Sequence, residues 1–275
     1  MRDVRALRLE GIEERYERYK EKIKNYTIMD DIFMRNVLKE QGCTEYMLQV
    51  IMNQKDLQVV EQTLQKDYKN LQGRSAILDC VARDERARQF NVEIQGDNEG
   101  ASPERARYHS CLLDMNILSP REPFTGLPET YIIFITRNDV LGYNRIICHI
   151  TRKVEEEGKD FGDGSHIIYV NSKKREDTEL GKLMHDLHCK ESGEMHSKIL
   201  ASRVRELKET EKGVSEMCRD MEEIYGEGME EGERKKARET VLSLAELKMS
   251  EEQISQIVKM PLEVVQGWIE ESLAI

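Results

Sequence analysis

Asp79 and Glu93 have the residue type and the spacing to bind one divalent cation between them. They lie in AILDCVARDERARQFNVEIQ, residues 76–95, whose charged stretch from Asp84 to Arg88 predicts the loop of a β-hairpin. A loop centred on Arg86 places the two acids directly opposite one another, because each lies seven positions from that residue. Directly opposed side chains in an antiparallel pair have Cβ atoms roughly 4.5–5.5 Å apart. Two carboxylates at that separation repel one another unless a cation lies between them.

The second arm of this hairpin has one apolar face and one polar face. Magnesium suits the polar face best, because it takes one or two carboxylates, keeps several waters and leaves positions for phosphate oxygens. A metal bound in this way can hold a scissile phosphate and lower the pKa of an attacking water. The alternative for the acid pair alone is the solvated face of an ordinary hairpin. The apolar residues are Phe90, Val92 and Ile94, and the polar ones are Gln89, Asn91, Glu93 and Gln95.

The order of the elements around the hairpin favours the metal site. A helix is predicted before the hairpin, from residue 30 to about residue 53. After the hairpin, Ser102 as N-cap and Pro103 as first residue open a second helix, which ends before Pro120. The apolar run YIIFIT, residues 131–136, is typical of a buried strand. The predicted order is therefore helix, strands, helix, strand.

These features resemble the PD-(D/E)xK nuclease superfamily, and within it a bacterial group of recombination-promoting nucleases and transposase-like proteins. The resemblance covers most of the chain, including DGSHIIYVNSKKRED, GKLMHDLHCKESGEMHSKILASRVRELKETEKG and the tail GEGMEEGERKKARETVLSLAELKMSEEQISQIV. The single residues that carry it are Asp30, Phe33, Asp79, Glu93, Gln95, Arg107 and Tyr108.

The resemblance implies an α/β fold with a restriction-endonuclease-like core of order αβββαβ, in which helices flank a mixed sheet. It implies that Asp79 and Glu93 bind catalytic Mg²⁺ or Mn²⁺ together with the backbone carbonyl of Ile94. Asp30 is a further candidate, either for a second metal shell or for placing the first metal. The implied activity is that of a metal-dependent endonuclease that hydrolyses phosphodiester bonds in DNA.

Two positions depart from the superfamily pattern. Gln95 stands where a lysine is usual, two residues after the glutamate, although the resembling group tends to carry this substitution itself. Lysine supplies positive charge near the attacking water, whereas an amide supplies only hydrogen bonds. We therefore expect Gln95 to orient the water in a slow or conditionally active nuclease. Met34 stands where relatives commonly have a lysine, and it receives no role.

A second hypothesis from another class remains open beside the enzyme. The missing lysine and the acidic balance of the chain are compatible with a catalytically weak or inactive nuclease fold that acts as a nucleic-acid-binding or protein-interaction module. Metal-dependent stabilisation that requires the acid pair distinguishes the two hypotheses, because a pure scaffold lacks it.

The distribution of charge is compatible with a DNA partner. The net charge is −11, but residues 211–275 hold 16 acidic and 8 basic residues, so most of the excess lies in the tail. Arg107 is the candidate for a phosphate contact on the second helix, with packing against the sheet as the alternative. Further basic groups that could hold phosphates or remain solvated are Arg83, Arg86, Arg88, Arg105, Lys173, Lys174 and Arg175.

Composition indicates a cytoplasmic protein without membrane segments. No apolar run approaches the roughly 20 residues of a membrane span, and the N-terminal residues lack a signal-peptide core. The six cysteines are scattered without any CxxC spacing, which is typical of free thiols in a reducing compartment.

The two ends of the chain are predicted to be helical additions. We divide the chain into an N-terminal arm (1–26), the nuclease-like domain with a sheet extension (27–210), and an acidic linker with a helical hairpin (211–275). The arm carries an apolar stripe that either docks on the core or forms a homodimer. The hairpin is more compatible with packing or self-association than with reading DNA, because no Lys or Arg follows Met260. The stripe consists of Leu9, Ile12, Tyr16, Tyr19, Ile23 and Tyr26.

Two further patterns are interpreted as structural. KLMHDLHC could place His185, His188 and Cys189 on one helical face near His196, but this spacing fits no standard zinc pattern. Three glycines at positions 226, 228 and 232 follow no strand and lack the lysine of a phosphate loop. We therefore expect a surface or core-edge role for the first group and a hinge in the acidic linker for the second.

Overall fold

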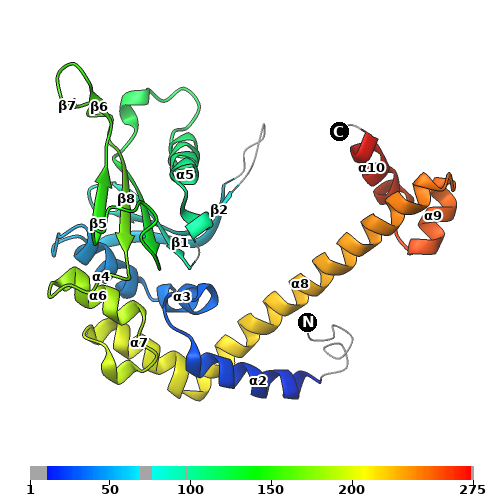
Figure 1. The fold of residues 1–275 in the computed structure, drawn as a ribbon, viewed down its shortest axis with the longest axis horizontal. Helices are drawn as coiled ribbons and strands as arrows, with labels where there is room; N and C mark the ends of the chain where they lie inside the picture. Colours follow the sequence, from blue (N-terminus) through cyan, green and yellow to red (C-terminus); the bar gives the residue numbers. More distant parts are fainter. Residues whose placement is uncertain (1–10, 69–75, 97, 274–275) are drawn as a thin grey trace. The chain divides into compact units, whose positions relative to one another are not determined.

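The computed structural model describes residues 11–68, 76–96 and 98–273 (Figure 1). These residues form two compact units, the first ending at Cys218 and the second beginning at Arg219. Within the described residues, no helix combines the length and the apolar character that a membrane crossing requires.

A six-stranded mixed sheet forms the centre of the first unit (Figure 1). Its strand order is β1-β2-β3-β4-β8-β5. The first two pairings and the last are antiparallel, whereas β3 with β4 and β4 with β8 are parallel. The strands are β1 (Val59–Tyr68), β2 (Ala76–Asp84), β3 (Gln89–Gln95), β4 (Thr130–Thr136), β5 (Ile147–Ile150) and β8 (Ser165–Asn171). A small separate hairpin consists of β6 (Lys153–Val154) and β7 (Lys159–Asp160).

Helices cover both faces of this sheet. The helix α5 (Pro103–Met115) packs against β2, β4 and β8, and η1 (Asn98–Ala101) leads into it. On the other face, α4 (Gln41–Ile51) packs on β1, and its Thr44 hydroxyl lies 3.9 Å from the Cys80 sulfur of β2. The element order from α4 to β4 is αβββαβ, so the predicted restriction-endonuclease-like architecture is confirmed.

The single helix predicted over residues 30–53 is wrong, because two helices occupy that stretch. These are α3 (Asp31–Leu38) and α4, with Glu40 in extended conformation as the N-cap of the second. The apolar stripe ends at Leu38, since the next positions in helical step are Gln41 and Gly42. The two helices therefore bury separate sets of apolar residues.

The remaining helices of the first unit surround α3 and α4. The helices α6 (Glu179–Leu187) and α7 (Lys198–Glu209) pack against α4, with η3 (Ser192–Glu194) between them; η2 (Phe124–Gly126) precedes β4. The arm helix α2 (Ile12–Asn25) buries Tyr19 and Ile23. Lys208 of α7 donates to the carbonyls of Lys24 and Tyr26, so the arm docks on its own core. Leu9 of the predicted stripe lies outside the described residues.

The stretch predicted to hold a hinge in an acidic linker lies in the long helix α8 (Glu211–Glu246). All three glycines at positions 226, 228 and 232 lie inside this helix. Each interior glycine costs about 1 kcal/mol relative to alanine, and the many Glu, Lys, Arg, Ala and Leu residues around them offset that cost.

The tail forms the predicted helical hairpin, α9 (Glu251–Val258) followed by α10 (Leu262–Leu273). The capping box of Ser250 and Gln253 begins α9 as predicted. Both helices pack on the last turns of α8 through a small core formed by Val241, Ile254, Val265 and Trp268.

Candidate metal and phosphate site

The acid pair, Asp79 and Glu93, lies where β2 meets β3 on the face that α5 covers. The strand register pairs Cys80 with Val92, so the next position along places Asp79 opposite Glu93. The backbone N–H of Asp79 donates to Oε1 of Glu93 at 3.2 Å. The register expected from a loop centred on Arg86 is therefore confirmed.

Glu93 is completely buried, and its two oxygens have different surroundings. Oε1 accepts from the Asp79 N–H and from Nδ2 of Asn91 at 3.0 Å. Oε2 has only longer contacts, with Nε2 of Gln95 at 3.4 Å and Nη2 of Arg105 at 3.7 Å. Since Glu93 and Asn91 are both 0% exposed, this is not the solvated face of an ordinary hairpin. Oε1 is fixed by the fold, and Oε2 remains the less occupied oxygen.

The surroundings of Asp79 disfavour its ionised form and therefore favour the binding of a proton or a cation. Burial, followed by the nearby charges of Glu93 and Asp31, raises the pKa of Asp79 to about 7. The charges of Arg35 and Arg105 act in the opposite direction, but they do not cancel this shift. A buried and a partly buried carboxylate with incomplete compensation of their charge favour a divalent cation.

A strained residue stands opposite Asp79 on the other neighbouring strand. Gln65 has φ of 51°, a left-handed conformation that is uncommon for a residue other than glycine. Its Nε2 donates to Oδ1 of Asp79 at 3.3 Å. Strain of this kind costs on the order of 1–3 kcal/mol and is concentrated at functional sites.

The helix α5 brings two side chains to Glu93. Ser102 caps the helix by accepting from the Arg105 N–H, as predicted, which fixes the first turn over the sheet. Arg105 donates from Nε to Nε2 of His109 at 3.3 Å. His109 Nδ1 lies 3.6 Å from Glu93 Oε1, and its ring packs 5.9 Å from the ring of Phe134.

The Gln95 amide lies beside Glu93 and close to Gly100 in the loop that follows β3. A Cβ atom at Gly100 would lie 2.2 Å from Oε1 of Gln95, so only glycine permits this position of the amide. Ile94 lies between Glu93 and Gln95 in β3 and is itself buried.

The structure engages Asp30 elsewhere. Its Oδ2 accepts from the N–H and the hydroxyl of Thr27 at 2.7 and 2.9 Å, and its Oδ1 lies 3.8 Å from Arg137 Nη2. The neighbouring Asp31 is the acid of α3 whose charge raises the pKa of Asp79. Through its contacts with Thr27 and Arg137, Asp30 holds the segment of chain that precedes α3.

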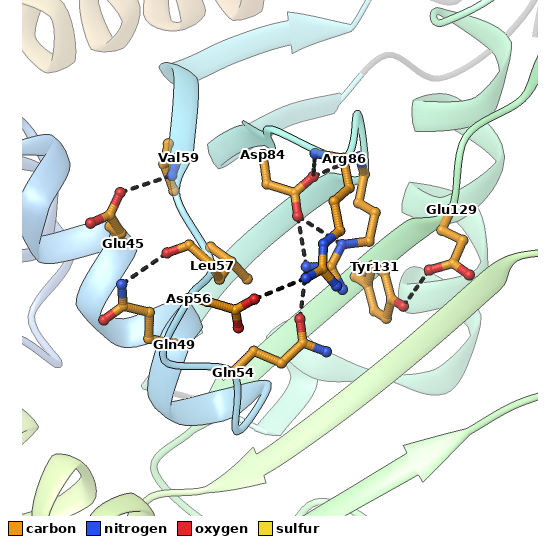
Figure 2. A network of polar contacts seen from close by, with 11 residues as sticks. Glu45, Gln49, Gln54, Asp56, Leu57, Val59, Asp84, Arg86, Glu129 and Tyr131 are labelled. Carbon is orange, nitrogen blue, oxygen red and sulfur yellow. Dashed lines mark hydrogen bonds and ion pairs between the residues drawn. The ribbon is translucent and has the colours of Figure 1, made fainter.

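The hairpin arginines lie at the turn, away from the acid pair. Asp79 is seven residues from the centre of the turn, or roughly 23 Å along a strand. Arg83 pairs with Glu61. Arg86 donates to Asp56 at 2.9 Å, and Figure 2 shows these two side chains. Arg88 is buried and bonds to Asp84 at 2.7 Å, so it is part of the fold and cannot reach a phosphate at the surface.

Arg107 points away from the acid pair. Two residues along a helix turn the side chain by about 200°, so Arg105 and Arg107 face nearly opposite directions. Arg107 is exposed, and it faces solvent rather than packing against the sheet.

The predicted histidine group divides between two locations. His188 is separate from the others, and its Nε2 lies 2.9 Å from the hydroxyl oxygen of Ser172. His185, Asp186 and His196 do come together, with potential ligand atoms within 4.8 Å of one another. Asp186, however, accepts the backbone N–H groups of His196 and Ser197 at 2.8 and 2.7 Å. These bonds hold the loop that precedes α7.

Sequence reasoning missed the roles of Arg105 and His109. In the sequence, Arg105 is one of several basic residues, and His109 belongs to no recognised motif. The available signal was their spacing of four residues on a helix that follows the hairpin, which places both on one face. Which face that is depends on the packing of α5, and no local pattern reveals it.

A mixed sheet flanked by helices, with an acid pair on two adjacent strands, defines a restriction-endonuclease-like nuclease fold. The chain belongs to the PD-(D/E)XK nuclease family of transposases, because the model of that family, described as PD-(D/E)XK nuclease family transposase, matches residues 43–225. The match covers Asp79, Glu93 and Gln95 and begins after Asp30. Neither a comparison with curated proteins nor one with solved structures finds a match.

Proposed function

We propose that this protein is a metal-dependent endonuclease that hydrolyses phosphodiester bonds in DNA. The observation that carries the proposal is the acid pair: two opposed carboxylates, Glu93 buried and Asp79 partly buried, without full compensation of their charge. Membership of a nuclease family supports DNA as the substrate and a divalent metal as the cofactor.

The donor set fits Mg²⁺ or Mn²⁺, which prefer oxygen ligands. Oε2 of Glu93 and the carboxylate of Asp79 are the proposed side-chain ligands, with the Ile94 carbonyl as a backbone ligand. A metal bound there would polarise the phosphate and lower the pKa of a water molecule. Asp30 is absent from this set because Thr27 and Arg137 already hold it.

The protein's own residues position and shield the reacting groups. The donors on Oε1 fix the orientation of Glu93, and Gln95, for whose amide Gly100 leaves room, orients the water. In the reaction, the water oxygen bonds to phosphorus and one ester P–O bond breaks. The water gives up a proton, and the departing oxygen takes up another.

The test is nicking of supercoiled plasmid in Mg²⁺ or Mn²⁺ by wild type, Asp79→Ala, Glu93→Ala and a control, Asp67→Ala. Asp67 is an exposed acid on β1, outside the acid pair. We expect loss of at least about 10³-fold in both site variants, because each removes a proposed metal ligand, and no change in the control.

The same four proteins are tested for stabilisation by Mn²⁺ in thermal unfolding. We expect stabilisation in wild type and control only, because a ligand stabilises the state that binds it. Equal cleavage by all four proteins would refute the assignment. Absence of both cleavage and stabilisation in wild type would favour the non-enzymatic nuclease-fold module.

A further inference from the structure

Gln95 leaves the site without the positive charge that a lysine would supply. Its Nε2 donates to Oε2 of Glu93, so the amide is engaged with the acid pair itself. An amide carries no net charge, and it stabilises a charged transition state less than a cation does. Any compensating charge must therefore come from another element.

Two arginines act on the acid pair, but only Arg105 is available. The charges of Arg35 and Arg105 both lower the pKa of Asp79. Arg35 is already bonded to Asp31 through Nε and Nη2. Arg105 has a side chain that is 41% exposed, and its contact with Glu93 is at 3.7 Å. Its guanidinium thus borders the acid pair and still reaches solvent.

His109 fixes the direction of Arg105. Its Nε2 accepts the Nε–H of Arg105, so this nitrogen carries no proton and the ring is in its Nδ1–H form. That Nδ1 is buried, without a hydrogen-bond partner among the described residues, and lies 3.6 Å from Oε1 of Glu93. The ring therefore lies between the arginine and the glutamate, and because the residue is only 2% exposed, the ring has little freedom to turn elsewhere.

We propose that Arg105 contacts the scissile phosphate and supplies the positive charge that Gln95 cannot supply, while His109 is a positioning residue for Arg105. The proposal rests on the proposed nuclease function. A guanidinium stays protonated in proteins, so Arg105 stabilises charge and transfers no proton. Its remaining N–H groups form a planar fork that matches two phosphate oxygens.

Arg205 of α7 provides a control of the same chemistry. It is exposed as Arg105 is, but it lies on a helix that carries none of the residues described around the acid pair. We expect Arg105→Ala to slow plasmid nicking by about 10²–10³-fold, the usual effect of removing one donor from a developing charge. Arg205→Ala should stay within about twofold of wild type, and Arg105→Lys should recover part of the rate because it keeps the charge.

Binding of Mn²⁺ separates this proposal from the proposed function. Arg105→Ala should keep the full thermal stabilisation by Mn²⁺, or gain more, because removal of a nearby cation strengthens the attraction of the acid pair for the metal. Loss of stabilisation in Arg105→Ala would overturn the proposal, since Arg105 would then support the metal site. Cleavage that depends on Asp79 and Glu93 but is unchanged in Arg105→Ala would overturn it as well and leave the nuclease assignment intact.

His109 is tested by its coupling to Arg105. We expect His109→Phe, which keeps the ring and its packing on Phe134, to slow nicking by about tenfold in the wild-type background. In the Arg105→Ala background the same change should have no further effect, because the residue it positions is absent. Additive losses in the double variant would overturn the positioning role and assign His109 to packing alone.

Discussion

The two ends of the β2–β3 hairpin bury charge in opposite ways. At the turn, Arg88 and Asp84 are both buried, lie 2.7 Å apart and balance one another. At the other end, Asp79 and Glu93 are of like charge, and the nearest basic groups of α5 lie 3.6 and 3.7 Å from Glu93. The charges at the turn end balance one another, whereas the positive charge near the acid end does not compensate both carboxylates.

This difference separates structural charge from functional charge. Asp84 accepts two backbone N–H groups of the loop as well as the guanidinium of Arg88, so its interactions define the turn. A buried ion pair of this kind needs no ligand. The acid end keeps carboxylates close together against their repulsion, which is costly unless a cation or a proton completes it. Charge balance, more than burial, therefore distinguishes the two ends.

The largest expected effect on stability is at the turn end. Arg88→Met should lower the free energy of unfolding by on the order of 3–5 kcal/mol, because it leaves the Asp84 carboxylate buried without its partner. Urea unfolding measures this loss. Adding Asp84→Asn to Arg88→Met should recover part of the loss, since the uncompensated charge is then gone. A loss below about 1 kcal/mol would contradict the view that the pair is a structural unit.

The acid end should respond with the opposite sign. The folded-state pKa of Asp79 is raised to about 7 from 3.8, so the folded state holds a proton that the unfolded state has released. The stability that this proton confers is complete below about pH 4 and is lost as pH rises through about 7. Asp79→Asn avoids that loss, so without metal it should be more stable than wild type at pH 8, by on the order of 1–3 kcal/mol.

The comparison is urea unfolding of both proteins in a chelator at pH 4 and pH 8. The gain from Asp79→Asn should be nearly absent at pH 4, where wild-type Asp79 is protonated in the folded state and partly protonated in the unfolded state. Adding Mn²⁺ at pH 8 should reverse the order, because only wild type keeps the ligand. An equal difference at both pH values would show that the amide acts through packing or hydrogen bonding.

The smallest effect is expected for a pair of the same chemistry at the surface. Arg83 and Glu61 form an ion pair at 3.0 Å with side chains that are 40% and 63% exposed. Arg83→Ala should change the free energy of unfolding by no more than about 0.5 kcal/mol, because solvent already screens the charges. A change comparable to that of Arg88→Met, measured in the same urea series, would contradict the ranking by burial.

Local sequence was sufficient for the hairpin and its register. Strict alternation in β3 and a turn centred on Arg86 determine which residues oppose one another, because a register slip would place the apolar side chains on the polar face. The cap of α5 and the capping box of α9 were likewise predictable from short motifs. Where apolar spacing alone was used, the prediction joined α3 to α4, since a stripe does not reveal a change in helix direction.

Long-range contacts were not predictable in the same way. Residue type makes Asp30 a candidate metal ligand and Arg88 a candidate phosphate contact, but Oδ2 of Asp30 accepts from Thr27, and Arg88 is buried against Asp84. The glycines at 226, 228 and 232 predict a hinge, whereas the structure places them inside α8.

The sequence by itself determined that Asp79 and Glu93 oppose one another, since strand alternation and loop length are local properties of the chain. The family match then gave this pair a nuclease context. Only the tertiary structure decided that α5 lays Arg105 and His109 against Glu93, and that burial raises the pKa of Asp79. The physical reason is that a pKa and the direction of a side chain depend on every neighbour within a few ångströms, and most of these neighbours are distant in the chain.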